Sequence, residues 1–122
     1  GLAALVDATL ARWFTPGYLR RQGPGVEMIR RIFLSSPPAG YIGCTEAIRR
    51  LNYLDELNRI ARPCLVVVGE EDPGTPVAAA RAIHERVAGS RLVVLPSASH
   101  LGNIEQAQAF NAALTGFLGS GV

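Results

Sequence analysis

The chain has 122 residues, the length of one domain, and its composition is 48% hydrophobic and 18% charged, with a mean hydropathy of +0.20. These values exclude a disordered chain, and no apolar run approaches the roughly 18 residues that a membrane-spanning helix needs. The net charge of +2 is too small to indicate a nucleic-acid partner. Cys44 and Cys64 give no disulfide framework or metal-ligand spacing, and no leader pattern opens the chain. We therefore expect a cytoplasmic protein without metal or other cofactor, and without a membrane or nucleic-acid partner.

Residues 1–62 are predicted to be helical, because their apolar residues recur at helical spacing and no strand pattern interrupts them. The predicted helical segments are residues 2–13, a segment between Gly23-Pro24-Gly25 and Ser35-Ser36, residues 39–51 and a short turn over 55–60. Nine arginines and five acidic residues give this half a net charge of +4. The arginine doublets are typical of solvated helix faces, and a positive rim around the entrance for an anionic substrate is the alternative.

After Pro63 the pattern changes to alternating strands and helices. The predicted elements are a strand over 64–68, a helix over 77–87, a strand over 91–95 and a helix over 107–118. This β-α-β-α order predicts a parallel pair of strands. Such a pair cannot form a core alone, since parallel sheets have several strands and both faces covered. We expect either a second copy of the chain or the remainder of a larger fold to supply the neighbours.

Asp72 and His100 are the candidate catalytic residues, because each follows a predicted strand at its carboxyl end. Alone, Asp72 is also typical of a turn or helix cap, and a single loop histidine usually has no catalytic role. Together they lie in adjacent strand-to-helix loops at the same edge of the sheet. A carboxylate that orients an imidazole is the acid–base pair of a catalytic triad.

The third member of such a triad, a nucleophile, has no candidate in this sequence. A nucleophilic serine on a strand-to-helix turn lies within Gly-x-Ser-x-Gly and precedes the acid and the histidine. None of the six serines has that setting. Cys64 begins a predicted strand and Cys44 lies on a predicted helix. We expect the serine to lie upstream of Gly1, on the same side as the missing strands.

Two loop motifs and two helical segments together resemble a known family. The motifs are Gly69-x-x-Asp72-x-x-Thr75-Pro76 and Ala98-x-His100-Leu101-x-Asn103-x-Glu105, and they resemble the C-terminal part of α/β-hydrolases. The segments from Leu10 to Pro16 and from Tyr41 to Arg49 resemble the helical lid of 3-oxoadipate enol-lactonases. The resemblance covers essentially the whole chain, and its loop motifs are specific to the superfamily rather than to the lactonases.

The resemblance implies a partial α/β-hydrolase fold, with a helical lid in residues 1–62 and the end of the core in 63–122. Asp72 would be the triad acid and His100 the general base of an enzyme that opens β-ketoadipate enol-lactone during breakdown of aromatic compounds. Arg12 would bind the substrate, with the guanidinium facing its carboxylate. Trp13 beside it would line the same substrate site, and packing in the core is the alternative for this tryptophan. The nucleophile and the oxyanion-hole amides match nothing in this chain, so we expect it to be inactive alone.

Two alternatives remain open at the level of sequence. Esterases, carbon–carbon bond hydrolases and haloperoxidase-like enzymes share the two loops, so the substrate could differ. The chain could also be a non-catalytic fragment that buries its strand edges against another copy.

Overall fold

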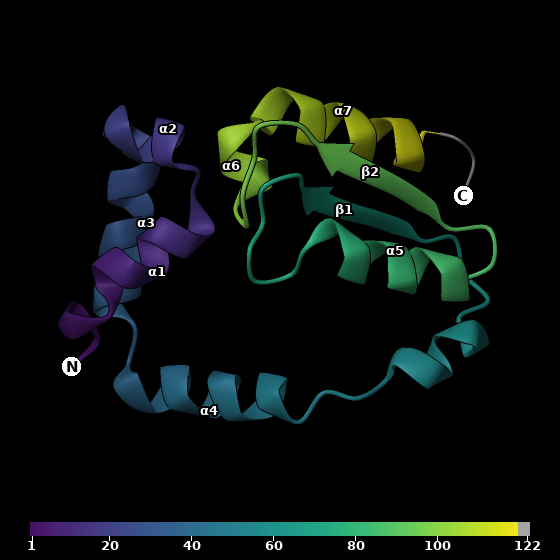
Figure 1. The fold of residues 1–122 in the computed structure, drawn as a ribbon, viewed down its shortest axis with the longest axis horizontal. Helices are drawn as coiled ribbons and strands as arrows, with labels where there is room; N and C mark the ends of the chain where they lie inside the picture. The colour runs from purple at the N-terminus through teal and green to yellow at the C-terminus, as the bar shows by residue number, and fades with distance from the viewer. Residues whose placement is uncertain (120–122) are drawn as a thin grey trace.

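The computed structural model describes residues 1–119, with helices in the first half and a β-α-β-α unit in the second, as predicted (Figure 1). The elements of the first half are η1 Leu2–Ala4, α1 Val6–Trp13, α2 Pro16–Arg20, α3 Pro24–Ser35, α4 Pro38–Arg49 and η2 Leu54–Arg59, where η denotes a 3-10 helix. The elements of the second half are β1 Leu65–Gly69, α5 Val77–Arg86, β2 Arg91–Leu95, α6 Gly102–Glu105 and α7 Ala107–Leu118. No helix within residues 1–119 is long and apolar enough to cross a membrane.

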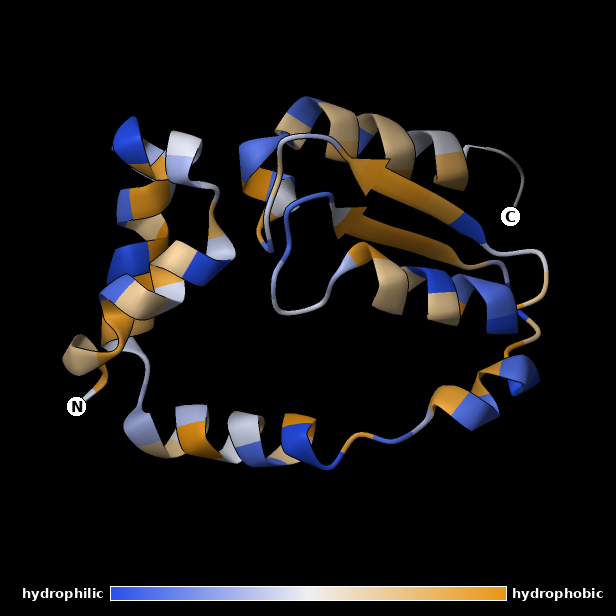
Figure 2. Cartoon of the chain, in the orientation of Figure 1, coloured by the Kyte–Doolittle hydropathy of each residue, from blue (hydrophilic) through white to orange (hydrophobic). Residues whose placement is uncertain are grey.

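β1 and β2 form a parallel pair in which Leu65 lies opposite Arg91 and Gly69 opposite Leu95. α5 connects the strands, and α5 and α7 pack against both of them from opposite sides in Figure 1. β1 begins one residue later than predicted, and Cys64 precedes it and accepts a hydrogen bond from the Arg91 amide. Both strands are apolar along most of their length (Figure 2). The β1 edge away from β2 has no strand partner among the described residues.

The first three helices pack around a small apolar core. Its buried members are Leu2, Val6, Leu10, Phe14, Val26 and Phe33. The segment predicted as one helix over 2–13 divides at Leu5, whose side chain is exposed. Thr15 then caps α2: its hydroxyl accepts a hydrogen bond from the Tyr18 amide, and Pro16 occupies the first turn, where its missing N–H is harmless. The Thr15-Pro16-Gly17 segment therefore starts a new helix.

α4 lies apart from the strands and has no buried residue (Figure 1). Ile42 and Ile48 are both more than half exposed. α4 contacts the helical core through Tyr41, whose ring packs edge-on against Phe33 at 5.6 Å between centroids. This half of the molecule therefore presents apolar side chains that the described residues do not cover.

The last helix, α7, has the predicted bounds, but only part of its predicted apolar face is buried. Phe110 and Phe117 are half-buried, whereas Leu114 and Leu118 are exposed. The sequence also did not predict α6, a single turn between His100 and α7. That turn holds Glu105 close to the first half of the chain.

Candidate active site

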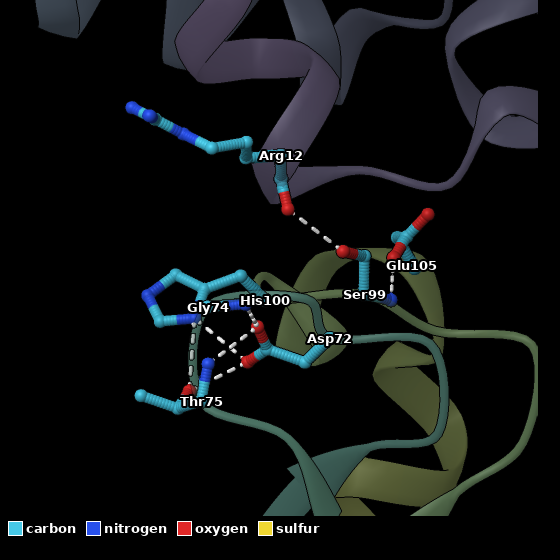
Figure 3. A network of polar contacts seen from close by, with 7 residues as sticks. All are labelled: Arg12, Asp72, Gly74, Thr75, Ser99, His100 and Glu105. Carbon is cyan, nitrogen blue, oxygen red and sulfur yellow. Dashed lines mark hydrogen bonds and ion pairs between the residues drawn. The ribbon is translucent and has the colours of Figure 1, made fainter.

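Asp72 lies in the loop that follows β1, with its side chain inside a turn that it stabilises (Figure 3). Its Oδ1 accepts hydrogen bonds from the amides of Gly74 at 2.8 Å and Thr75 at 3.0 Å. Its Oδ2 accepts one from the Thr75 hydroxyl at 2.7 Å. The turn role that sequence reasoning considered for this aspartate is therefore real, and it leaves Oδ2 available for a second partner.

That second partner is His100, whose Nδ1 lies 2.8 Å from Asp72 Oδ2. The Asp72 side chain is 4% exposed and the His100 side chain 41%, so the carboxylate is enclosed while the imidazole reaches the surface. A carboxylate can only accept, so Nδ1 carries the proton in this bond and the lone pair of the neutral ring is on Nε2. The geometry is that of an imidazole oriented by a buried carboxylate.

The hydrogen bonds around Asp72 determine its ionisation. Burial raises its pKa, and the bonds from the Thr75 amide, the Thr75 hydroxyl, the His100 ring and the Gly74 amide lower it. The lowering effects prevail, and the pKa lies below the ordinary aspartate value of 3.8. Asp72 is therefore ionised at neutral pH and can stabilise a protonated His100.

The acid loop and the histidine loop are joined where β1 ends. The amide of Glu70 donates to the Leu95 carbonyl at 2.9 Å, and the amide of Glu71 donates to the Ala98 carbonyl at 2.8 Å. Gly69 lies directly against the backbone of the histidine loop, and a Cβ there would collide with the carbonyl oxygens of Ser99 and Ala98. Glycine at position 69 thus allows the approach that brings Asp72 to His100.

Trp13 and Arg12, the candidate substrate-binding residues, lie at the end of α1 close to this pair. The Trp13 ring stacks on His100 with 6.3 Å between centroids and 25° between planes. Trp13 also packs edge-on against Phe33 at 5.8 Å. The Arg12 side chain is exposed, points away from Asp72 in Figure 3, and makes no ion pair with the described residues. Trp13 is thus in contact with the histidine, and Arg12 is a free positive charge one residue away.

Two cavities adjoin these residues. One of about 180 Å³ lies beneath the acid–histidine pair and is lined by Asp72, Thr75 and His100 together with Gly69 and Asn103. The other, of about 460 Å³, is apolar and lies between α1, α3 and α4. Trp13 lines this second cavity and also stacks on His100, so it connects the apolar space with the imidazole.

Sequence reasoning assigned no role to Thr75, Ser99 or Glu105. Thr75 follows Asp72 by three positions, a spacing typical of a side-chain-stabilised turn, so its contact could have been predicted. The partner of Glu105 is Thr15, 90 positions away, and no local pattern indicates it. Among the described residues, no serine or cysteine side chain hydrogen-bonds to His100. Those residues also contain no cluster of three or more metal-ligating side chains.

Residues 46–122 match the α/β-hydrolase family described as TAP-like protein. The chain belongs to the α/β-hydrolase family.

Relatives of this α/β-hydrolase chain include lactonases and esterases. It is 38% identical over 114 residues to 3-oxoadipate enol-lactonase 2 of Acinetobacter baylyi, which covers 93% of the chain and 42% of that protein. It is 35% identical over 77 residues to a pimeloyl-[acyl-carrier protein] methyl ester esterase of Neisseria meningitidis, covering 63% of the chain and 30% of the esterase. The crystal structure of the enol-lactonase from Burkholderia xenovorans LB400 superposes with a TM-score of 0.94 at 38% identity. That superposition covers 98% of the chain and 46% of the lactonase.

The predicted fold is thereby confirmed as a partial α/β-hydrolase, and the chain spans less than half the length of these relatives.

Proposed function

We propose that this chain supplies the acid and the base of a serine hydrolase that opens an enol-lactone of the 3-oxoadipate type. The observation that carries the proposal is the 2.8 Å contact between Asp72 Oδ2 and His100 Nδ1, with the imidazole reaching the surface. The similarity to enol-lactonases along nearly the whole chain supports the substrate class.

In the proposed reaction, His100 Nε2 takes the proton of a serine hydroxyl as the oxygen attacks the lactone carbonyl. Asp72, which stays ionised, stabilises the imidazolium that forms. Collapse of the tetrahedral intermediate breaks the ring C–O bond, and His100 returns its proton as the enol leaves. The enol tautomerises to the ketone, and His100 then activates water to release the acyl group from the serine.

The substrate-binding part of the proposal rests on the end of α1. The exposed Arg12 guanidinium is a suitable counter-ion for a substrate carboxylate. The Trp13 ring offers a flat apolar surface beside the imidazole, next to the cavity of about 460 Å³. A small cyclic substrate with one anionic group matches this combination.

The proposed partner of the chain is the amino-terminal half of a hydrolase core, which would contribute the serine and further strands. Two observations support this partner: the chain covers 42% and 46% of the two enol-lactonases, and one edge of β1 has no strand partner within residues 1–119. We further propose that residues 1–62 act as the lid and 63–122 complete the core. A second copy of the chain is the alternative partner.

The test combines the chain with an amino-terminal hydrolase half that carries a Gly-x-Ser-x-Gly elbow and measures enol-lactone hydrolysis. His100→Ala should lower kcat by about 10³- to 10⁶-fold, as the loss of a triad base does. His84→Ala is the matched control, because His84 is the only other histidine and it bonds to Ser90 instead of a carboxylate.

A mild effect of His100→Ala would exclude it as the base. Hydrolysis of simple esters without hydrolysis of the enol-lactone would make the enzyme an esterase. If the chain formed a folded homodimer and the amino-terminal half restored no hydrolysis, a second copy of the chain would be the favoured partner.

A further inference from the structure

Glu105 connects two parts of the chain that are distant in sequence. One carboxylate oxygen, Oε1, accepts hydrogen bonds from both the amide and the hydroxyl of Thr15, each at 2.8 Å. The other oxygen, Oε2, accepts one from the amide of Ser99 (Figure 3). Thr15 is the residue that caps α2, and Ser99 immediately precedes His100. A single carboxylate therefore holds the α1–α2 corner against the histidine loop.

Two further bonds join the same segments. The Ser99 hydroxyl donates to the Arg12 carbonyl at 2.8 Å, and the Leu101 amide donates to the Trp13 carbonyl at 3.0 Å. These bonds flank His100 on one segment and Trp13 on the other. The Trp13–His100 stacking is thus enclosed by hydrogen bonds on both sides.

The donors that Glu105 binds are buried, which makes their dependence on the carboxylate strong. Thr15 is 8% exposed and Ser99 is 2% exposed. If the carboxylate is lost, three polar hydrogens lose their acceptor where water has little access. Thr15, Ser99 and Glu105 are not members of the apolar core of α1 and α3, whereas Leu101 and Ile104 beside them pack against that core. The carboxylate therefore adds polar contacts that orient the corner where apolar packing already brings the two parts together.

We infer that Glu105 is a positioning residue that holds Trp13 against His100 and thereby fixes the orientation of the base relative to the lid. It acts through Thr15 and Ser99 and touches neither Asp72 nor the His100 ring. The catalytic meaning of this inference rests on the proposed role of His100, whereas the geometry can be tested without any activity.

The single tryptophan of the chain makes a direct measurement possible. A protonated imidazole in contact with an indole quenches its emission, so Trp13 fluorescence reports on the protonation of His100. The intact 122-residue chain is titrated from about pH 8.5 to about pH 5, the range in which histidine takes up its proton. His100→Gln identifies the part of the signal that comes from this ring. Three charged groups belong to the segments around this ring: Asp72 hydrogen-bonds to it, Arg12 precedes the stacked Trp13, and Glu105 bonds to Ser99, which precedes His100.

The test variant is Glu105→Gln, which keeps the size of the side chain. An amide has one acceptor oxygen and turns two hydrogens toward the remaining donor, so it cannot bind Thr15 and Ser99 together. The loss of one hydrogen bond to a charged acceptor changes an equilibrium constant by about 10- to 100-fold. The arrangement in which Trp13 stacks on His100 should therefore lose most of its population. Glu85→Gln is the matched control, because Glu85 is an exposed glutamate on α5 whose loss changes the net charge equally.

We expect the His100-dependent fluorescence change to be present in the unmodified chain and in Glu85→Gln, and to be lost in Glu105→Gln. An unchanged signal in Glu105→Gln, or its absence from the unmodified chain, would overturn the inference. Circular dichroism verifies folding. If Glu105→Gln does not fold, Thr15→Ala removes one of the three donors while leaving the carboxylate, and it should reduce the signal partially; no reduction there would equally overturn the inference.

The reconstituted hydrolase separates this inference from the proposed function. Glu105→Gln should lower kcat by about tenfold or more with little change in KM, because a displaced base affects the chemical step. Fluorescence coupling that depends on Glu105 in a protein without hydrolytic activity would leave the inference standing and refute the function. If Glu105→Gln changed neither hydrolysis nor the His100-dependent fluorescence, the proposed function would stand and the inference about Glu105 would be refuted.

Discussion

Gly69→Ala should destabilise the protein, because the structure leaves no room for a Cβ at position 69. The added methyl would meet the carbonyl oxygens of Ser99 and Ala98, which are backbone atoms with no rotamer to change. Crowding of this kind costs about 1–3 kcal/mol. Separating the two loops also weakens the bond from the Glu70 amide to Leu95 at the end of β2 and the bond from the Glu71 amide to Ala98 in the histidine loop, at about 1 kcal/mol each. We expect the free energy of unfolding to fall by about 2–5 kcal/mol.

The assay is urea unfolding followed by far-ultraviolet circular dichroism, with Gly116→Ala as the control. Gly116 lies within α7, and a Cβ there would meet no atom within 4 Å. Because alanine is the better helix former, Gly116→Ala should raise the free energy of unfolding by about 1 kcal/mol. Both substitutions replace a glycine with an alanine, yet Gly69→Ala should lower the free energy of unfolding and Gly116→Ala should raise it. If Gly69→Ala were as stable as the unsubstituted chain, the close approach of the two loops would not exist as described.

The remaining predictions concern the acid. Asp72 binds its proton less readily folded than unfolded, so its stabilisation is complete above about pH 4 and is lost as the pH falls further. Asp72→Asn should therefore flatten the acid side of the stability–pH curve measured by urea unfolding; an unchanged curve contradicts the lowered pKa. Thr75→Val removes the hydroxyl bond to Oδ2 and should cost about 1.5–3 kcal/mol at neutral pH. Its effect should disappear in the Asp72→Asn background, and full additivity would refute the shared bond.

The acid–histidine pair could be predicted because it depends on topology alone. Once Asp72 and His100 are assigned to the ends of two parallel strands joined by one helix, the sheet brings them to the same edge. The bounds of β2 and α7 were predictable for a similar reason, since β-branched runs and helical periodicity are local properties.

Other features depend on distances that no local pattern encodes. The stacking of Trp13 on His100 and the contact of Glu105 with Thr15 arise only when both halves of the chain are in place. Periodicity identified Leu114 and Leu118 as apolar positions of α7, but it could not tell whether anything covers them, and both are exposed. α6 was missed because one helical turn carries too few residues for a periodic signal.

The contacts of the site close chain segments of very different length. Asp72 and His100 are 28 positions apart, whereas Thr15 and Glu105 are 90 apart. Since the entropy of loop closure grows with the logarithm of length, the longer closure costs about 1 kcal/mol more. The acid–histidine pair can therefore form within the β1–α5–β2 unit before the helical half docks. In the folded protein the helical half is held to the histidine loop by the Glu105 bonds and by the Ser99–Arg12 and Leu101–Trp13 bonds, so the two halves separate only if all of these bonds break together.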